Sequence, residues 1–313
     1  MAHDVACIGL TILDILGRPI DHIPEGGAVS LVDDIRLTVA GTAAGVAVNC
    51  AKLGLRTLLV GAIGDDREGD FLLSLARRDG IDTSAVQRAA GFPTSATILT
   101  IRSNGDRPAF HRLGAANFLT LGPADYDRVL GAKFIHLGGV GNLAQLDGQP
   151  TADLLAAAKA RGCTVTCDLG APTMGTLDAL KAALPHVDYF MPSLEEAAVI
   201  CARSEPAEVA RFFMSLGAKA CVFKCGADGS YLAAPGREQR IPAFKVDVVD
   251  TTGCGDSYCA GFIAGLAQGW AVEKACRLGT ATAALVATGL GTDAGVVNLE
   301  QTTRAMETLA VLD

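Results

Sequence analysis

The stretch VDTTGCGDSYCAGF, from Val249 to Phe262, concentrates small, acidic and hydroxyl-bearing residues at the start of an apolar segment. Gly253, Cys254 and Gly255 come directly before Asp256 and the expected helix SYCAGFIAGLAQG. Small residues at a helix start leave several main-chain N–H groups pointing at one spot, where the helix dipole adds partial positive charge. The stretch therefore predicts an anion site of the kind that holds phosphate.

Asp256 adds a carboxylate beside this site. A carboxylate there can accept the proton of an attacking hydroxyl, while the N–H groups offset the charge on a phosphoryl group in transfer. Aspartate is also a common cap at a helix N-terminus, so the motif alone leaves both roles open. The chemistry that it offers is phosphoryl transfer to a hydroxyl, with Asp256 as the base.

Strand-like and helix-like segments alternate along most of the chain, with helices expected near residues 42–53 and 68–78. Several strands, such as KFIHLGG and TVTCDLG, are apolar throughout, as in parallel sheets covered on both faces. We predict one α/β domain over residues 1–313, a doubly wound and mostly parallel sheet sandwiched by helices. Such sheets bind ligands at the carboxyl ends of their strands, where Gly139, Asp168 and Ser193 are expected.

Two segments, about residues 11–39 and 94–113, interrupt the alternation. The second predicts a hairpin in which Asn104 and Gly105 form a tight two-residue turn, since both residues tolerate a positive φ. We expect a small β-rich lid that excludes water from the active site. The alternative is a decorative hairpin or a dimerisation strand, and we also expect a homodimer through the lid.

Composition excludes several classes of partner. The chain has 313 residues, 50% of them hydrophobic, and a net charge of −8 without a dense Lys/Arg block, so we expect no nucleic-acid partner. Its apolar runs are too short to cross a membrane, and its N-terminus lacks a secretory pattern, which predicts a cytoplasmic protein. The ten cysteines include no Cys-x-x-Cys pair and are expected to be buried hydrophobes rather than disulfides or metal ligands.

The motif DTTGCGD resembles the C-terminal signature Asp-Thr-x-Gly-Ala-Gly-Asp of the ribokinase-like (PfkB) carbohydrate kinases, with Cys254 in place of alanine. The segments VAGTAAGVAVNCAKLG, RLGAANFL and MPSLEEA resemble further family regions in the proper order, so the likeness covers nearly the whole chain. The resemblance implies the ribokinase-like fold and a kinase that uses ATP and Mg²⁺ to phosphorylate a hydroxyl of a sugar or sugar-like molecule.

The resemblance also implies roles for individual residues. For catalysis it implies Asp256 as the base and an anion hole made by the amides of Gly253, Cys254 and Gly255. The candidate substrate contacts, including the lid histidine, are Asp14, Gly41, Gly45, His111 and Asn117. The candidate nucleotide contacts are Lys224, Gly226, Gly229, Thr252 and Ala283. Glu196 is associated with Mg²⁺, and Asp250 matches a position that binds a monovalent cation, such as K⁺, in some members.

Three departures from the family pattern bear on these roles. Ala40 replaces the first of two paired glycines, Gly45 replaces a polar residue, and Ser193 replaces an asparagine. Because serine has a shorter reach than asparagine, we expect a water between Glu196 and the metal. Because Gly45 leaves room for a bulkier substrate, a nucleoside kinase of the same fold is an alternative. A non-catalytic member that binds a sugar or nucleotide is another. We expect His136 to be a satisfied core residue, and Cys254 to be either packed or a reactive thiol.

The sequence carries neither of two competing nucleotide motifs. It has no Gly-x-x-x-x-Gly-Lys-Ser/Thr loop, which excludes a P-loop kinase at the level of motifs. GLGTDAG has the wrong spacing for a dinucleotide fingerprint, which argues against a dehydrogenase.

Overall fold

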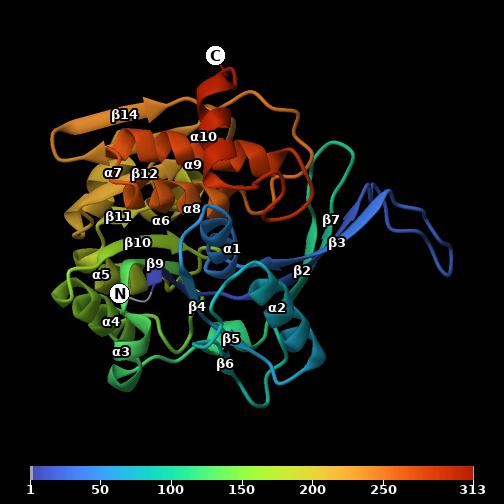
Figure 1. The fold of residues 1–313 in the computed structure, drawn as a ribbon, viewed down its shortest axis with the longest axis horizontal. Helices are drawn as coiled ribbons and strands as arrows, with labels where there is room; N and C mark the ends of the chain where they lie inside the picture. The colour runs from blue at the N-terminus through green and yellow to red at the C-terminus, as the bar shows by residue number, and fades with distance from the viewer. Residues whose placement is uncertain (1–2, 313) are drawn as a thin grey trace.

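The computed structural model describes residues 3–312 and is built on an eight-stranded sheet in the order β14-β13-β12-β11-β10-β9-β1-β4 (Figure 1). Six neighbouring strands run parallel, and β13 and β14 extend one edge as an antiparallel hairpin. The strands are β1 (His3–Gly9), β4 (Thr57–Val60), β9 (Ala132–Val140), β10 (Thr164–Leu169), β11 (Tyr189–Phe190), β12 (Ala220–Lys224), β13 (Ser230–Ala234) and β14 (Arg237–Ile241). The predicted fold class is confirmed.

Helices cover both faces of this sheet. One face packs against α1 (Ala44–Lys52), α2 (Arg67–Arg78), α8 (Cys254–Ala267), α9 (Val272–Ala287) and α10 (Leu299–Thr308). The other packs against α3 (Tyr126–Val129), α4 (Gln149–Ala160), α5 (Thr176–Ala183), α6 (Leu194–Cys201) and α7 (Pro206–Ser215). Short 3₁₀ turns lie at η1 (Ala115–Phe118), η2 (Pro123–Asp125), η3 (Leu184–His186) and η4 (Gly226–Asp228).

The central strands supply both hydrophobic cores because their side chains alternate between the faces. In β1, Val5 and Cys7 join the core under α1 and α8, whereas Ala6 and Ile8 join the core on the opposite face. This explains why the central strands read as continuous apolar runs in the sequence.

A second, four-stranded sheet has the order β3-β2-β7-β8 and projects from the body of the molecule, with the loop of residues 19–33 farthest out (Figure 1). Its strands are β2 (Ile12–Arg18), β3 (Asp34–Ala40), β7 (Ala96–Thr100) and β8 (Ala109–Arg112). These strands come from the two segments that interrupt the α/β alternation in the sequence. A two-stranded sheet pairs β5 (Ala62–Ile63) with β6 (Gln87–Arg88).

The β7–β8 hairpin is confirmed, but its predicted two-residue turn is wrong. Gly105 has φ +89°, whereas Asn104 is not among the described residues with positive φ. The amide of Gly105 bonds to the carbonyl of Arg102 at 3.0 Å, and the amide of Arg102 bonds to the carbonyl of Asp106 at 2.8 Å. This pattern is a three-residue connection that needs a left-handed residue only at its last position, which glycine supplies.

All ten cysteines are free thiols in the structure, and seven of them are buried, as expected for small hydrophobic residues. Over residues 3–312, the longest apolar helices fall short of what a membrane crossing requires.

Candidate active site

The first turn of α8 presents unpaired main-chain N–H groups. Gly253, the N-cap residue, has φ +77° and provides no side-chain cap. Within residues 3–312, no acceptor pairs with the amides of Gly253, Gly255 or Asp256, and the amide of Cys254 reaches the Thr251 carbonyl only at 3.3 Å. Unpaired amides at the N-terminus of a 14-residue helix form a suitable anion site.

Glycine is required at position 253 for two reasons. Its backbone lies in the left-handed region, and a Cβ added there would lie 2.5 Å from the Cα of Thr292. The turn before α8 is therefore packed directly on the loop that follows α9.

Asp256 lies next to these amides and faces α1. A Cβ added at Gly45 would lie 2.8 Å from Oδ2 of Asp256, so the missing side chain at position 45 makes room for this carboxylate. The structure thus gives the unusual Gly45 a role within the site.

The carboxylate of Asp256 accepts no hydrogen bond from any residue that the structure describes. Burial and the neighbouring carboxylate of Asp168 raise the pKa of Asp256 to about 7, against the opposing effect of Lys224. A carboxylate that titrates near neutral pH and lacks a donor is suited to accept a proton.

Asp14 belongs to a row of polar residues across the small sheet. The register pairs it with Thr38 of β3 and Thr97 of β7, and pairs Thr97 with His111 of β8. Directly paired residues share one face of a sheet, so all four side chains lie on the same side. The structure therefore brings together Asp14 and His111, which are 97 positions apart in the sequence.

Burial raises the pKa of Asp14 to about 7, although the Thr97 hydroxyl and the guanidinium of Arg107 act to lower it. The Thr97 hydroxyl also lies 3.0 Å from Nδ1 of His111. Thr38 and Thr97 escaped the sequence analysis, because only strand pairing places them beside Asp14. Arg107 escaped it because its charge acts on Asp14 from the connection between β7 and β8.

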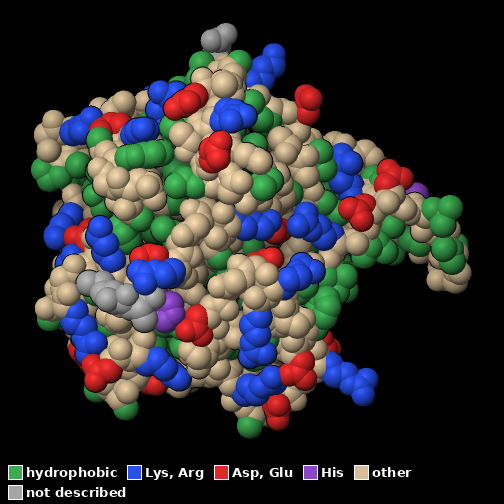
Figure 2. All heavy atoms as spheres, viewed as in Figure 1, with side chains coloured by type: hydrophobic (Ala, Val, Ile, Leu, Met, Phe, Trp, Pro, Cys, Tyr) green, Lys and Arg blue, Asp and Glu red, His purple; other side chains and the backbone are tan. Residues whose placement is uncertain are grey.

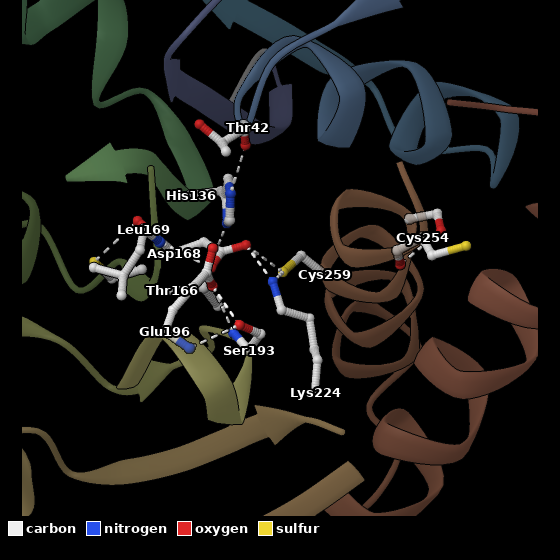
Figure 3. Close-up of polar contacts among 12 residues, drawn as sticks. Thr42, His136, Thr166, Asp168, Leu169, Ser193, Glu196, Lys224, Cys254 and Cys259 are labelled. Carbon is white, nitrogen blue, oxygen red and sulfur yellow. Dashed lines mark hydrogen bonds and ion pairs between the residues drawn. The ribbon is translucent and has the colours of Figure 1, made fainter. Parts of the chain in front are cut away.

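A buried ion pair lies on the other side of the anion site. Nζ of Lys224 is 2.5 Å from Oδ2 of Asp168 and 3.2 Å from the position that a Cβ of Gly255 would take (Figure 3). Burial alone would lower the pKa of Lys224, but Asp168 and Glu196 raise it well above its usual value, so the ammonium stays charged. Lys224 thus holds a positive charge beside the amides of α8.

Asp168 was noticed in the sequence only as a residue at a strand end. Its pairing with Lys224, 56 positions away, joins the carboxyl ends of β10 and β12, which lie on either side of the short strand β11. The opposite charges of two residues at strand ends were the only sign of this pair in the sequence, and they do not say which strand ends meet.

Ser193 and Glu196 form a capping box at the start of α6. Oε2 of Glu196 accepts hydrogen bonds from the amide and hydroxyl of Ser193 at 2.9 and 2.7 Å, and the Ser193 hydroxyl accepts one from the Glu196 amide (Figure 3). Replacement of the family asparagine by serine therefore gives a cap that fixes the orientation of Glu196.

His136 is a satisfied core residue, as predicted. Because the Thr42 carbonyl can only accept, Nε2–H of His136 donates to it at 3.1 Å, and Nδ1 accepts from the Thr166 hydroxyl at 2.9 Å (Figure 3). Burial lowers the pKa of His136 to about 4, so the ring is neutral. The histidine ties the turn after Gly41 to β10.

Cys254 is packed. Its Sγ lies 3.5 Å from the carbonyl of Ala283 in α9 and points away from the Asp168–Lys224 pair (Figure 3). Burial, with Asp250 nearby, raises the pKa of the Cys254 thiol to about 12, so a reactive thiolate is not favoured. The same contact brings Ala283, a candidate nucleotide residue, next to the first turn of α8.

The next four candidate residues are three glycines and Asn117. Gly41 has φ +95° and no room for a side chain beside the Leu10 carbonyl. Gly226 and Gly229 shape the turn between β12 and β13, both with positive φ. Asn117 is different, because its side-chain amide donates to the main-chain carbonyl of Asn142 in the loop after β9. Its side chain therefore does not belong to the polar row that contains Asp14.

Asp250 is buried directly before the anion turn. One of its carboxylate oxygens accepts from the amide and hydroxyl of Thr252, at 2.9 and 2.7 Å, and the other accepts from the amide of Gly291, also at 2.9 Å. Three protein donors therefore hold this carboxylate.

The sequence matches the pfkB family carbohydrate kinase model over residues 2–298. The chain belongs to this family. A 5-dehydro-2-deoxygluconokinase from Shouchella clausii is 31% identical to this pfkB chain, with 79% of the chain and 80% of the relative covered. An ATP-dependent 6-phosphofructokinase from Thermoanaerobacterium thermosaccharolyticum is 25% identical, with 90% and 87% covered.

A solved ribokinase from Arabidopsis thaliana, complexed with ribose and ATP, superimposes on the pfkB chain with a TM-score of 0.79 at 22% identity, covering 98% of this chain and 99% of the other. The protein is thus an ATP-dependent sugar kinase of the pfkB family, a phosphotransferase with an alcohol acceptor.

Replacement of Lys224 by methionine is expected to lower the free energy of unfolding by about 3–5 kcal/mol at neutral pH, because the buried Asp168 loses its partner. Urea unfolding measures this effect. Lys181, which pairs with Asp178 on the surface, is the control, and Lys181→Met should cost at most about 1 kcal/mol. Equal costs for the two variants would contradict the importance of the buried pair.

The rate constant kcat/KM is expected to fall below pH 7. The raised pKa values of Asp14 and Asp256, both about 7, mean that lowering the pH through this value protonates both carboxylates, and neither can then accept a further proton. A pH–rate profile of the free enzyme should rise through pH 7 and level off above it. A flat profile between pH 5 and 8 would show that neither carboxylate takes part in catalysis in its ionised form.

Proposed function

We propose that Asp256 is the general base of this sugar kinase and that the main-chain amides of residues 253–255 form the anion hole for the transferred phosphoryl group. One observation supports the proposal most strongly. Main-chain amides without an acceptor lie next to a carboxylate, that of Asp256, which receives no hydrogen bond and has a pKa of about 7. This arrangement agrees with the signature motif that the sequence shares with the family.

In the proposed reaction, the row of Asp14, Thr97 and His111 binds sugar hydroxyls, and one hydroxyl lies between Asp256 and the γ-phosphate of ATP. Asp256 accepts the proton of that hydroxyl as its oxygen forms a bond to phosphorus and the bond from phosphorus to the β–γ bridging oxygen breaks. The amides of Gly253 and Gly255 and the ammonium of Lys224 offset the charge on the phosphoryl oxygens. ADP and a sugar phosphate leave.

Mg²⁺, when bound, supplies charge neutralisation of the phosphates. No three His, Cys, Asp or Glu side chains within residues 3–312 lie close enough together to hold a metal by themselves. This suits Mg²⁺, which usually keeps waters and takes substrate phosphates as ligands. Glu196, oriented by its capping box, would reach the ion through a water.

The K⁺ site at Asp250 stays a prediction. The three donors to its carboxylate leave only its remaining lone pairs for an ion. Replacing K⁺ by choline in the assay tests the site, and an unchanged rate would rule it out.

A substrate panel tests the function. Hexoses, pentoses, keto-deoxy sugar acids and nucleosides would each be added with ATP and Mg²⁺ while ADP release is measured. We expect turnover with a sugar or sugar acid, the latter because the deoxygluconokinase relative acts on one by name. Turnover confined to nucleosides would favour the nucleoside kinase, and ATP binding without turnover on any acceptor would favour a non-catalytic protein. Thermal shift at about 100 times Kd should show about 2.7 kcal/mol of stabilisation.

We also propose a homodimer through the small sheet. The face opposite Asp14 carries the cross-strand row Leu37, Ile15, Ile98 and Phe110, with Ile98 50% and Phe110 56% exposed. Figure 2 shows hydrophobic side chains gathered along this projecting part of the molecule. An apolar sheet face of this kind is commonly covered by a partner, and the second copy of this chain is the partner that we propose.

Phe110→Glu is therefore expected to convert the dimer to a monomer in sedimentation experiments, because a charge would be buried at the interface. Phe71→Glu, at a phenylalanine of α2 that is 41% exposed, is the matched control and should leave the dimer intact. A monomeric parent protein at micromolar concentration would refute the proposal.

A further inference from the structure

The loop of residues 290–293, between α9 and α10, is buried although it has no regular structure. A buried loop must find partners for its main-chain polar groups. The partners of three of its carbonyls come from the opposite end of the sequence. We call residues 290–293 the bridging loop.

Side chains from residues 36–52 satisfy the carbonyls of the bridging loop. Arg36 of β3 donates to the carbonyl of Leu290 at 2.6 Å, and Lys52 of α1 donates to that of Asp293 at 3.0 Å. Asn49 of α1 donates to the carbonyl of Thr292 at 2.9 Å.

Ion pairs add to these hydrogen bonds. The carboxylate of Asp293 lies 2.8 Å from the guanidinium of Arg36 and 2.5 Å from the ammonium of Lys52, and the Asp293 residue is only 8% exposed. The Thr292 hydroxyl also donates to the carbonyl of Val39, the penultimate residue of β3. The bridging loop is thus fixed to the small sheet and to α1 at once.

The same loop sets the position of the anion hole. The amide of Gly291 donates to Asp250, and the Cα of Thr292 lies where a side chain of Gly253 would be. A displacement of the bridging loop would therefore displace the turn that carries the unpaired amides. The bridging loop is also linked to the proposed substrate row. Its partner Arg36 lies in β3, two residues before Thr38, and Thr38 pairs with Asp14.

From these contacts we infer that Arg36, Lys52 and Asp293 are positioning residues, which hold the anion hole in register with the substrate-binding sheet through the bridging loop. None of the three touches the reacting atoms. The guanidinium of Arg36 makes two of the contacts, to Leu290 and Asp293, and its planar fork suits this double role better than a lysine ammonium does. The inference rests on the proposed function of the anion hole.

Arg36→Met tests the inference. We expect kcat to fall about 3- to 30-fold while KM for the sugar changes less than about 3-fold, because the amides, and not the sugar contacts, lose their position. Hydrogen exchange measured by mass spectrometry should become faster in peptides that span residues 251–256. Arg36→Lys should recover part of the rate, since one donor of the pair is retained.

Arg161→Met is the matched control. Arg161 also binds a main-chain carbonyl, that of Tyr126, and a carboxylate, that of Asp127, and its side chain is 37% exposed against 36% for Arg36. It lies at the end of α4, away from the anion hole, and should leave both kcat and exchange at residues 251–256 unchanged.

An unchanged kcat together with unchanged exchange in folded Arg36→Met would overturn the inference, and so would equal effects from Arg161→Met. If Arg36→Met does not fold, Asp293→Asn serves in its place with the same readouts and the same criteria. Exchange at residues 251–256 does not depend on turnover. Faster exchange in a protein whose parent turns over no acceptor would therefore indicate failure of the proposed function and not of the positioning role.

Discussion

Asp256→Asn is expected to lower kcat by about 10²- to 10⁴-fold while KM for ATP changes little. Asparagine keeps the size of the side chain but cannot accept the proton of the substrate hydroxyl. A coupled assay of ADP release, with the acceptor identified by the substrate panel, measures the effect. Near-normal turnover of the folded variant would show that another group accepts the proton.

The same substitution should stabilise the protein. Because burial raises the pKa of Asp256 from 3.8 to about 7, the folded state binds a proton more tightly than the unfolded chain does. Stability therefore decreases as the pH rises from about 4 to about 7, and above pH 7 the buried charge costs on the order of a few kcal/mol. Asp256→Asn removes this cost, so its melting temperature above pH 7 should exceed that of the parent.

Asp178→Asn is the control for both effects. Asp178 also lies in the first turn of a helix, α5, but its side chain is 82% exposed. This variant should change neither kcat nor the pH dependence of stability.

Gly253→Ala is expected to lower kcat by about 10²- to 10³-fold, the effect of losing one donor in an oxyanion hole. The new Cβ would lie 2.5 Å from the Cα of Thr292, a main-chain atom that cannot turn aside, so the whole turn must shift. Steady-state kinetics measures the loss, and the affinity for a non-hydrolysable ATP analogue should fall with it.

Gly236→Ala separates the clash from the backbone effect. Gly236 has φ +73°, close to the +77° of Gly253, and a Cβ there meets nothing within 4 Å. Both variants should lose stability, because each places an alanine in the left-handed region, but only Gly253→Ala should lose activity. Similar kinetics for the two variants would contradict the assigned role of the anion turn.

The fold and the centre of the site could be predicted from the sequence because their signals are local. Apolar strands alternating with helices predict the doubly wound sheet, and small residues before a helix predict the unpaired amides of α8 whatever the rest of the chain does. His136, in the middle of an apolar strand, was likewise predictable as a core residue. The hairpin turn at Asn104 was mispredicted, because the same residues fit a three-residue connection equally well.

The parts that could not be predicted depend on contacts between distant residues. Nothing local to Asp168 or Lys224 says that they form an ion pair beside the amides of α8. The contact of Gly45 with Asp256 could not be predicted for the same reason, since the two residues lie 211 positions apart in the sequence. Arg36 appears as an ordinary surface charge until the position of the bridging loop is known.

The hydrogen bonds and ion pairs between residues 36–52 and residues 290–293 also have a consequence for biosynthesis. The two residues of each contact are more than 240 positions apart in the sequence. Because translation adds about 5–20 residues per second, the second residue is synthesised many seconds after the first. Catalytic competence must therefore arise late, after nearly the entire polypeptide has left the ribosome. A nascent chain arrested before residue 290 would already contain all the strands from β1 to β14 and would still lack a working centre.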